Sequence, residues 1–183
     1  PTCSMKHFLL FITLSSSCLA EHWPLNEVDS HIAVLGKAKV ASGAHDQSLV
    51  LDGLSLIELK ETAALNSADG FTFSVWFNPY AVNGGQQVIA GKNRYSLNER
   101  QWSLTVEPDG RLKAFVQHGG WATVTSKEAL KSGHWQLATL TVGSGKAALF
   151  LNGQNQGEVK LKRPMPTTMA LITLGGIHDA GRR

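Results

Sequence analysis

The sequence predicts an all-β fold built from short antiparallel strands, and three observations lead to this prediction. From residue 32 onward, short apolar runs alternate with polar residues, turn-forming residues separate the runs, and the runs recur at a spacing of roughly eight to twelve residues. A chain of 183 residues with 43% hydrophobic content can bury one sizeable core but is too short for two. We therefore expect a single antiparallel sandwich or barrel.

The predicted strands share period-two alternation, because side chains along a strand point to opposite faces in turn. They cover residues 48–53, 55–59, 71–77, 86–92, 101–107, 111–117, 121–126, 135–142, 146–153 and 169–176. A single helical turn is expected, at 60–66, where the sequence reads KETAALN. No internal repeat with a solenoid or propeller period is present.

Turn residues predict that consecutive strands pair as hairpins. Glycine adopts left-handed backbone conformations at little cost and asparagine tolerates them. The turn segments are Asp109-Gly110, Gly143-Ser144-Gly145 and Asn152-Gly153. Across the first of these turns, both flanking strands can present an apolar row to one core. The two rows are Trp102, Leu104 and Val106 on one strand and Leu112, Ala114 and Val116 on the other.

The segment FTFSVWFN at 71–78 has two unlike faces. One face is apolar throughout, and the other carries Trp76 among polar neighbours. We expect Phe73 and Val75 to be buried between two sheets and Trp76 to point the opposite way.

The N-terminal residues have the pattern of a secretory signal peptide at 5–20. A short basic start precedes the apolar run FLLFITL, and small residues suited to cleavage follow, ending at Ala20. Residues 1–4 are then an upstream remnant, and 21–183 form the exported domain. The apolar run is too short to span a bilayer, and no later segment is apolar enough to do so.

Cysteine usage agrees with this interpretation. Cys3 and Cys18 both precede the expected cleavage point, so disulfides cannot stabilise the mature chain. The alternative is a lipoprotein signal with Cys18 as the lipid-modified residue. The formal charge of +3 is spread along the chain without a basic run, which argues against a nucleic-acid partner.

Five segments together resemble the laminin G-like domains of bacterial exported proteins, within the concanavalin A-like lectin and glucanase superfamily. In order they are SLVLDG, FTFSVWFNPY, HWQLATLTV, KAALFLNGQNQG and LITLGG. The resemblance covers about residues 22–181 and implies a two-sheet antiparallel jelly roll with a concave face.

One departure from the family pattern concerns the C-terminus. Such domains usually end with one more strand, and the sequence stops at Arg183 before it. The resemblance therefore implies a C-terminally incomplete domain, whose first strand near HWPL at 22–25 lacks its partner. An unpaired edge favours association. It also implies that a parent protein could carry a polysaccharide hydrolase or sulfatase domain.

The sequence offers no catalytic constellation. The paired glutamates of the related glucanases are absent, and no metal-ligand histidine spacing or Gly-x-Ser-x-Gly turn occurs. Aromatic residues instead favour binding, because tryptophan and tyrosine stack on sugar rings. The carbohydrate-binding candidates are Trp76, Tyr80, Tyr95 and Trp121. Trp102 and Trp135 are expected to be structural, and Trp121 fits either role.

Two polar loops suggest a calcium site, because their oxygen atoms are of the kind that calcium prefers. Asn98 and Glu99 lie in RYSLNER, and Asp179 lies in GGIHDAGR. The order of these loops is similar to that in pentraxins, a calcium-dependent lectin group of the same superfamily, although only Asp179 matches the second pentraxin loop. The alternative is that all three side chains are merely solvated.

We therefore expect a non-catalytic carbohydrate-binding or adhesion module of an exported protein. The alternative is a structural accessory domain that docks on an adjoining hydrolase or sulfatase domain and binds no sugar.

Overall fold

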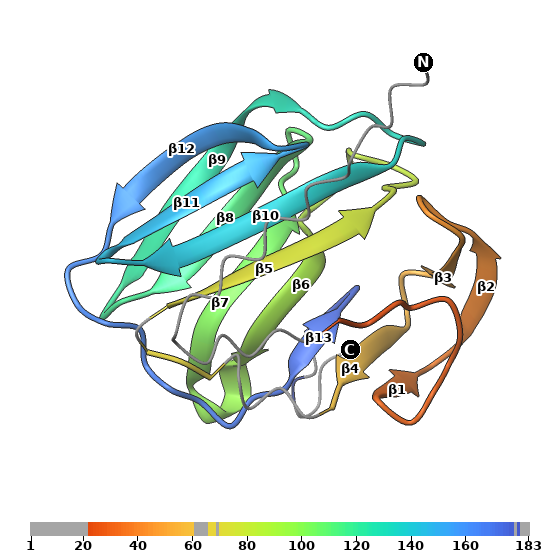
Figure 1. Cartoon of the computed structure of the whole chain (residues 1–183), viewed down its shortest axis with the longest axis horizontal. Coiled ribbons are helices and arrows are strands. Elements are labelled where there is room, and N and C mark those ends of the chain that lie inside the picture. The colour runs from red at the N-terminus through yellow and green to blue at the C-terminus, as the bar shows by residue number, and fades with distance from the viewer. Residues whose placement is uncertain (1–21, 61–65, 69, 178, 180–183) are drawn as a thin grey trace, which may run out of the picture.

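The computed structural model describes residues 22–60, 66–68, 70–177 and 179, and it shows a β-sandwich (Figure 1). A seven-stranded sheet has the order β1-β4-β13-β6-β7-β8-β9, and a four-stranded sheet has the order β12-β11-β10-β5. Strands β2 and β3 form a separate hairpin to one side. The prediction of an all-β, two-sheet antiparallel sandwich of the jelly-roll type is confirmed. None of the described helices is long and apolar enough to cross a membrane.

The elements follow one another in short steps along the chain. Their bounds are β1 Ile32–Leu35, β2 Ala38–Ser42, β3 Gln47–Leu51, β4 Leu56–Leu59, β5 Gly70–Phe77, β6 Gln87–Arg94, the 3-10 helix η2 Tyr95–Leu97, β7 Glu99–Val106, β8 Arg111–Gln117, β9 Trp121–Ala129, β10 Gln136–Gly143, β11 Lys146–Leu151, β12 Gln154–Lys160 and β13 Ile172–Leu174. Each predicted strand has a counterpart. The predicted helical turn at 60–66 lies mostly outside the described residues.

The turns form where their residues predict them. Ser144 and Gly145 have φ values of 49° and 72° and connect β10 to β11. Asn152 and Gly153, at 50° and 78°, connect β11 to β12 in the same way. Positive φ at both central residues gives a tight hairpin turn whose twist matches that of the strands. The antiparallel pairing of the last three strands of the four-stranded sheet therefore depends on short turn segments.

Three strands were not predicted, and their composition explains this. β2 and β12 are mostly exposed, and β12 is also mostly polar, so neither shows the apolar alternation that marks a half-buried strand. β1 is short, with only Ile32 fully buried. These strands form because neighbouring strands supply hydrogen-bonding partners, which is information that lies elsewhere in the sequence.

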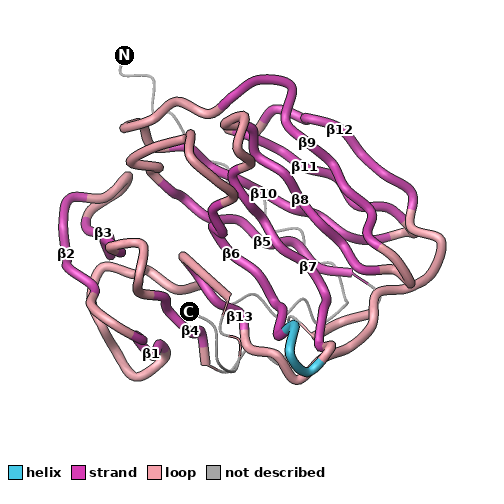
Figure 2. Tube along the Cα trace, turned by 180° about the vertical axis from the view of Figure 1, so that it is seen from behind, coloured by secondary structure: helices cyan, strands magenta, loops and turns pink. Residues whose placement is uncertain are grey.

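The core lies between the two sheets, at the crossing of β7 and β8 with β10 and β11 (Figure 2). Trp102 has no exposed surface and packs on Phe73, with ring centroids 4.8 Å apart. The two apolar rows predicted across the Asp109-Gly110 turn are all buried and pair directly, Trp102 with Val116 and Val106 with Leu112. The structural role of Trp102 is confirmed.

The prediction that a first strand near residues 22–25 lacks its pairing partner is wrong, because these residues form no strand. His22 to Leu25 form no strand, and Trp23 and Leu25 pack against the core instead. The four-stranded sheet ends at β5, whose one side pairs with β10. Pro24 fits this outcome, since a proline has no backbone N–H to donate to a strand partner.

Candidate functional site

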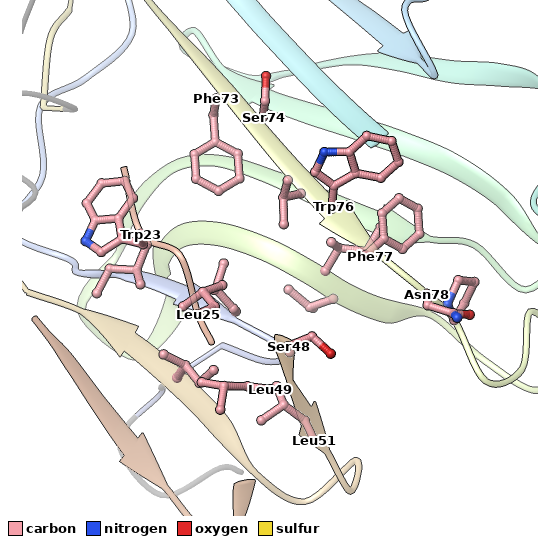
Figure 3. Close-up of a pocket in the computed structure, with 18 of the residues that line it drawn as sticks. Trp23, Leu25, Ser48, Leu49, Leu51, Phe73, Ser74, Trp76, Phe77 and Asn78 are labelled. Carbon is pink, nitrogen blue, oxygen red and sulfur yellow. The ribbon is translucent and has the colours of Figure 1, made fainter. Parts of the chain in front are cut away.

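A large cleft opens where the four-stranded sheet ends. It has a volume of about 2530 Å³ and lies between β5 on one side and β3 on the other (Figure 3). Every residue of both strands lines it. Trp23 and Leu25, in the segment before β1, also line it. The cleft exists because no described strand joins β5 to the β2–β3 hairpin.

The floor of the cleft is apolar. Val75 and Phe77 from β5, with Leu49 and Leu51 from β3, are half-buried and pack against the main core. Phe73 is only 6% exposed, as predicted, while Val75 is less buried than predicted. Both side chains line the cleft, but of the two Phe73 is the one that packs on the Trp102 ring.

The opposite face of β5 carries Trp76, as the alternation predicts. Figure 3 shows Trp76 and Ser74 on one side of the strand and Phe73 on the other. Trp76 is 42% exposed. The Ser74 hydroxyl lies 2.9 Å from the Thr139 hydroxyl of β10, so polar groups flank the indole. An exposed indole beside hydroxyl groups can stack on a sugar ring while its neighbours hydrogen-bond to sugar hydroxyls.

A histidine that the sequence did not single out completes this surface. His45, in the turn between β2 and β3, contacts Trp76 edge-on, with ring centroids 5.1 Å apart and an interplanar angle of 81°. The contact holds the tip of the hairpin close to the end of β5. Nothing in the local sequence indicates it, since the two residues lie on elements that do not pair.

The other aromatic candidates fall into two groups. Tyr80 is 98% exposed, Tyr95 is 40% exposed, and both line the cleft together with Trp76. The Arg100 guanidinium lies over the Tyr95 ring, 4.7 Å from its centre. Burial raises the pKa of Tyr95, so its hydroxyl stays protonated at neutral pH. Trp135, expected to be structural, is half-buried and also lines the cleft.

Trp121 belongs to the other sheet. It begins β9, is half-buried, and packs edge-on against Phe115 of β8 with centroids 6.0 Å apart. Lys113 lies 4.7 Å from the centre of the Phe115 ring. The structure therefore does not combine all four aromatic candidates into one site. Three line the cleft, and the fourth forms a separate aromatic pair on the seven-stranded sheet.

The predicted calcium residues lie around η2. The Ser96 N–H donates to Asp179 Oδ1 at 2.8 Å, so the two predicted loops do meet. Asn98 adopts a left-handed conformation with φ 56°, and its N–H donates to the Tyr95 carbonyl. Glu99 Oε2 is buried and has no hydrogen-bond partner. Among the described residues, however, no three histidine, cysteine or acidic side chains gather as a metal cluster. Calcium binding stays a prediction.

The charged residues that line the cleft within the described chain are all acidic. They are Asp46, Asp52 and Asp179, and no lysine or arginine accompanies them. A side-chain hydrogen bond with Ser55 and the backbone N–H of Leu54 lower the pKa of Asp52, so it is ionised at neutral pH. The cleft is thus locally negative in a chain whose formal charge is +3.

Comparisons with known proteins agree with this fold. A family model described as the concanavalin A-like lectin/glucanases superfamily, Laminin_G_3, matches residues 52–182. No curated protein sequence matches the chain.

Three solved structures illustrate the likeness in fold. The binding domain of Paraclostridial Mosquitocidal Protein 1 aligns with a TM-score of 0.64 and 17% identity, over 80% of this chain and 40% of that chain. Domains LG4-5 of the mouse laminin alpha1 chain align with a TM-score of 0.53 and 19% identity, over 63% of this chain and 30% of that chain. The Ruminococcus gnavus IT-sialidase CBM40 bound to alpha2,3 sialyllactose aligns with a TM-score of 0.56 and 14% identity, over 68% and 74%.

With sequence identities of 17%, 19% and 14%, these alignments show that the fold is shared and do not show a shared function. The chain spans less than half the length of the first two structures.

Proposed function

We propose that this chain, which belongs to the concanavalin A-like lectin/glucanase superfamily, is a non-catalytic carbohydrate-binding or adhesion module of an exported protein. Structures of similar fold support the glycan part of this proposal, since one of them is a CBM40 bound to sialyllactose. The apolar segment at 8–14 supports export; it lies outside the described residues.

The observation that carries the proposal is Trp76. Trp76 is 42% exposed on a regular strand, and Thr72 and Ser74 precede it on the same face, so much of its indole is available to a ligand. Its indole is already oriented by His45, so little side-chain freedom is lost when a sugar stacks on it. Tyr80, nearly fully exposed just beyond β5, extends the same aromatic surface.

A glycan array tests the proposal. The folded chain should bind a subset of the glycans, with its fold confirmed by circular dichroism on the same sample. A well-folded chain that binds no glycan on the array contradicts the proposal. Bound glycans should be recovered unhydrolysed, because the module is proposed to be non-catalytic.

A second candidate function is that of an accessory domain that docks on an adjoining domain and binds no sugar. The apolar cleft favours it, since apolar surface of this extent is normally covered by protein in the working assembly. The complete reading frame would separate the two functions. A hydrolase or sulfatase domain beside this one would support the accessory role, whereas repeated modules of this type would support adhesion.

A further inference from the structure

The outer face of the four-stranded sheet continues the surface around Trp76 across β10 and β11, which follow β5 in this sheet (Figure 1). Side chains directly opposite each other in paired antiparallel strands point to the same face. Trp76 is opposite Leu137 of β10. In the next row, Ser74 is opposite Thr139 of β10, and Thr139 is opposite Phe150 of β11. All five side chains are exposed or half-buried, so this face is open to a ligand well beyond β5.

A third row adds two more hydroxyl groups to this face. Thr72 is opposite Thr141 of β10, and Thr141 is opposite Ala148 of β11. In the row beside it, the Ser74 and Thr139 hydroxyls lie 2.9 Å apart. The hydroxyl groups of β5 and β10 thus form a compact group that apolar side chains border on two sides. These apolar side chains are Trp76, Leu137, Phe150 and Ala148.

Charge on this face is confined to its far edge. Among the described side chains that β5, β10, β11 and β12 point outward, the charged ones are Lys146, Glu158 and Lys160. The Lys146 ammonium lies 3.2 Å from the Glu158 carboxylate, so these two charges compensate each other. A carboxylate or sulfate placed over the uncharged part would lose hydration without gaining an ionic partner. The face between Trp76 and Phe150 therefore favours an uncharged ligand.

We propose that this face binds an extended, uncharged polysaccharide chain, with Trp76 and Phe150 as two separate stacking positions. This inference rests on the proposed carbohydrate binding at Trp76 and names the class of glycan bound there. The sugar units of a ribbon-like chain have apolar C–H faces and hydroxyl groups at their rims. That combination matches aromatic rings on either side of a group of hydroxyls.

The separation of the two rings sets the length of the chain. Neighbouring strands lie about 5 Å apart, and successive side chains on one face of a strand lie about 7 Å apart. Trp76 and Phe150 are two strands and one such step apart, which corresponds to about 12 Å along the diagonal. A single sugar cannot contact both rings over this distance, whereas a chain of several sugar units can.

A chain-length series tests this inference. The probes are cello-, manno- and xylo-oligosaccharides, each from the single sugar to the hexasaccharide, titrated calorimetrically into the full chain. We expect at least one series to bind. Its hexasaccharide should bind at least about tenfold more tightly than its shortest member that binds, because only the long chain reaches both rings. A carboxymethylated form of the same chain should bind more weakly than the neutral form.

Variants at Phe150 separate the two stacking positions. Phe150→Leu keeps an apolar side chain but removes the ring, so it should weaken hexasaccharide binding by about tenfold and leave the shortest binding oligosaccharide unaffected. Phe150→Tyr keeps the ring and should bind both like wild type. Phe115→Leu is the matched control, because Phe115 is also half-buried but lies on the seven-stranded sheet. The chain-length series needs no variant, so it tests the inference even if Phe150→Leu fails to fold.

Several outcomes overturn this inference and leave the proposed function standing. They are glycan binding on the array without binding of any of the three series, equal affinity for short and long chains, preference for the carboxymethylated chain, and hexasaccharide binding that Phe150→Leu leaves unchanged or that Phe115→Leu weakens equally. Concentration-dependent dimers that Phe150→Leu dissociates, without oligosaccharide binding, assign the face to a second copy instead. A folded chain that binds no glycan at all overturns the proposed function and this inference together.

Discussion

The two halves of the sandwich use the same sequence pattern with different results. Where β7 and β8 face β10 and β11, alternating apolar residues are fully buried, as for Leu104, Leu112 and Leu140. Where β5 faces β3, equally apolar residues such as Leu49 and Phe77 are only half-buried and line the cleft. We call these the closed half and the open half. The difference is that no described strand joins β5 to β3, so the apolar side chains beside this gap stay partly uncovered.

This contrast teaches that alternation predicts which way a side chain points but not what covers it. Phe73 and Phe77 belong to one strand and point to the same face, yet only Phe73 lies under Trp102. Stability should come mainly from the closed half, while the open half retains apolar surface for binding.

The largest expected effect compares two phenylalanines of β5. Phe73→Ala should lower the free energy of unfolding by about 3 to 5 kcal/mol, since it removes a buried ring that packs on Trp102. Phe77→Ala should cost clearly less, about 1 to 2 kcal/mol, because its ring is already partly hydrated. Urea unfolding of both variants measures this, and equal costs would show that the two halves are packed alike.

The next effect concerns calcium at the edge of the open half. If Asn98, Glu99 and Asp179 bind the ion, calcium at about a hundred times its dissociation constant stabilises the fold by about 2.7 kcal/mol. Thermal unfolding with calcium and with a chelator measures the difference, and Asp179→Asn should abolish it. Magnesium at the same ionic strength is the control. Identical melting curves in calcium and chelator rule the site out.

A matched pair of glycines should show no difference between the halves. Gly153, between β11 and β12, has φ 78°, and Gly53, after β3, has φ 80°. A Cβ atom at either position meets nothing within 4 Å, so substitution strains only the local backbone. Both Gly153→Ala and Gly53→Ala should cost roughly 1 to 2 kcal/mol. A much larger cost at one position would reveal tertiary contacts there.

What could be predicted from the sequence differs between the closed half and the open half. The β7–β8 hairpin was fully predictable, because Asp109-Gly110 fixes the turn and two apolar rows fix the facing. The cleft was not, because it depends on β3 failing to pair with any strand but β2. The direction in which Trp76 points follows from the alternation of residues along β5, whereas its contact with His45 depends on where the β2–β3 hairpin lies. β2 was missed because its side chains are mostly exposed.

The smallest effect is a pH dependence that arises from Lys92 of β6. Lys92 is 2% exposed, its ammonium donates to the Ala170 carbonyl, and burial lowers its pKa below 10.5. The unfolded chain therefore holds the proton to higher pH than the folded chain. The free energy of unfolding should rise as pH increases from the folded-state pKa of Lys92 toward 10.5. Below the folded-state pKa this gain is absent, because the folded chain then buries a charged ammonium. Urea unfolding of wild type and Lys92→Met across this range should show the rise only in wild type. A parallel pH dependence in both proteins would exclude Lys92 as its source.

The central claim is that the outer face of β5 binds carbohydrate through Trp76, and one titration tests it most directly. A glycan selected on the array is titrated calorimetrically into wild type, Trp76→Ala and Trp121→Ala. Trp121, half-buried against Phe115 on the other sheet, is the matched aromatic control. We expect Trp76→Ala to weaken binding at least about tenfold, as loss of one stacked ring does, while Trp121→Ala binds like wild type. Unchanged affinity in a folded Trp76→Ala protein, or an equal loss in both variants, would contradict the claim.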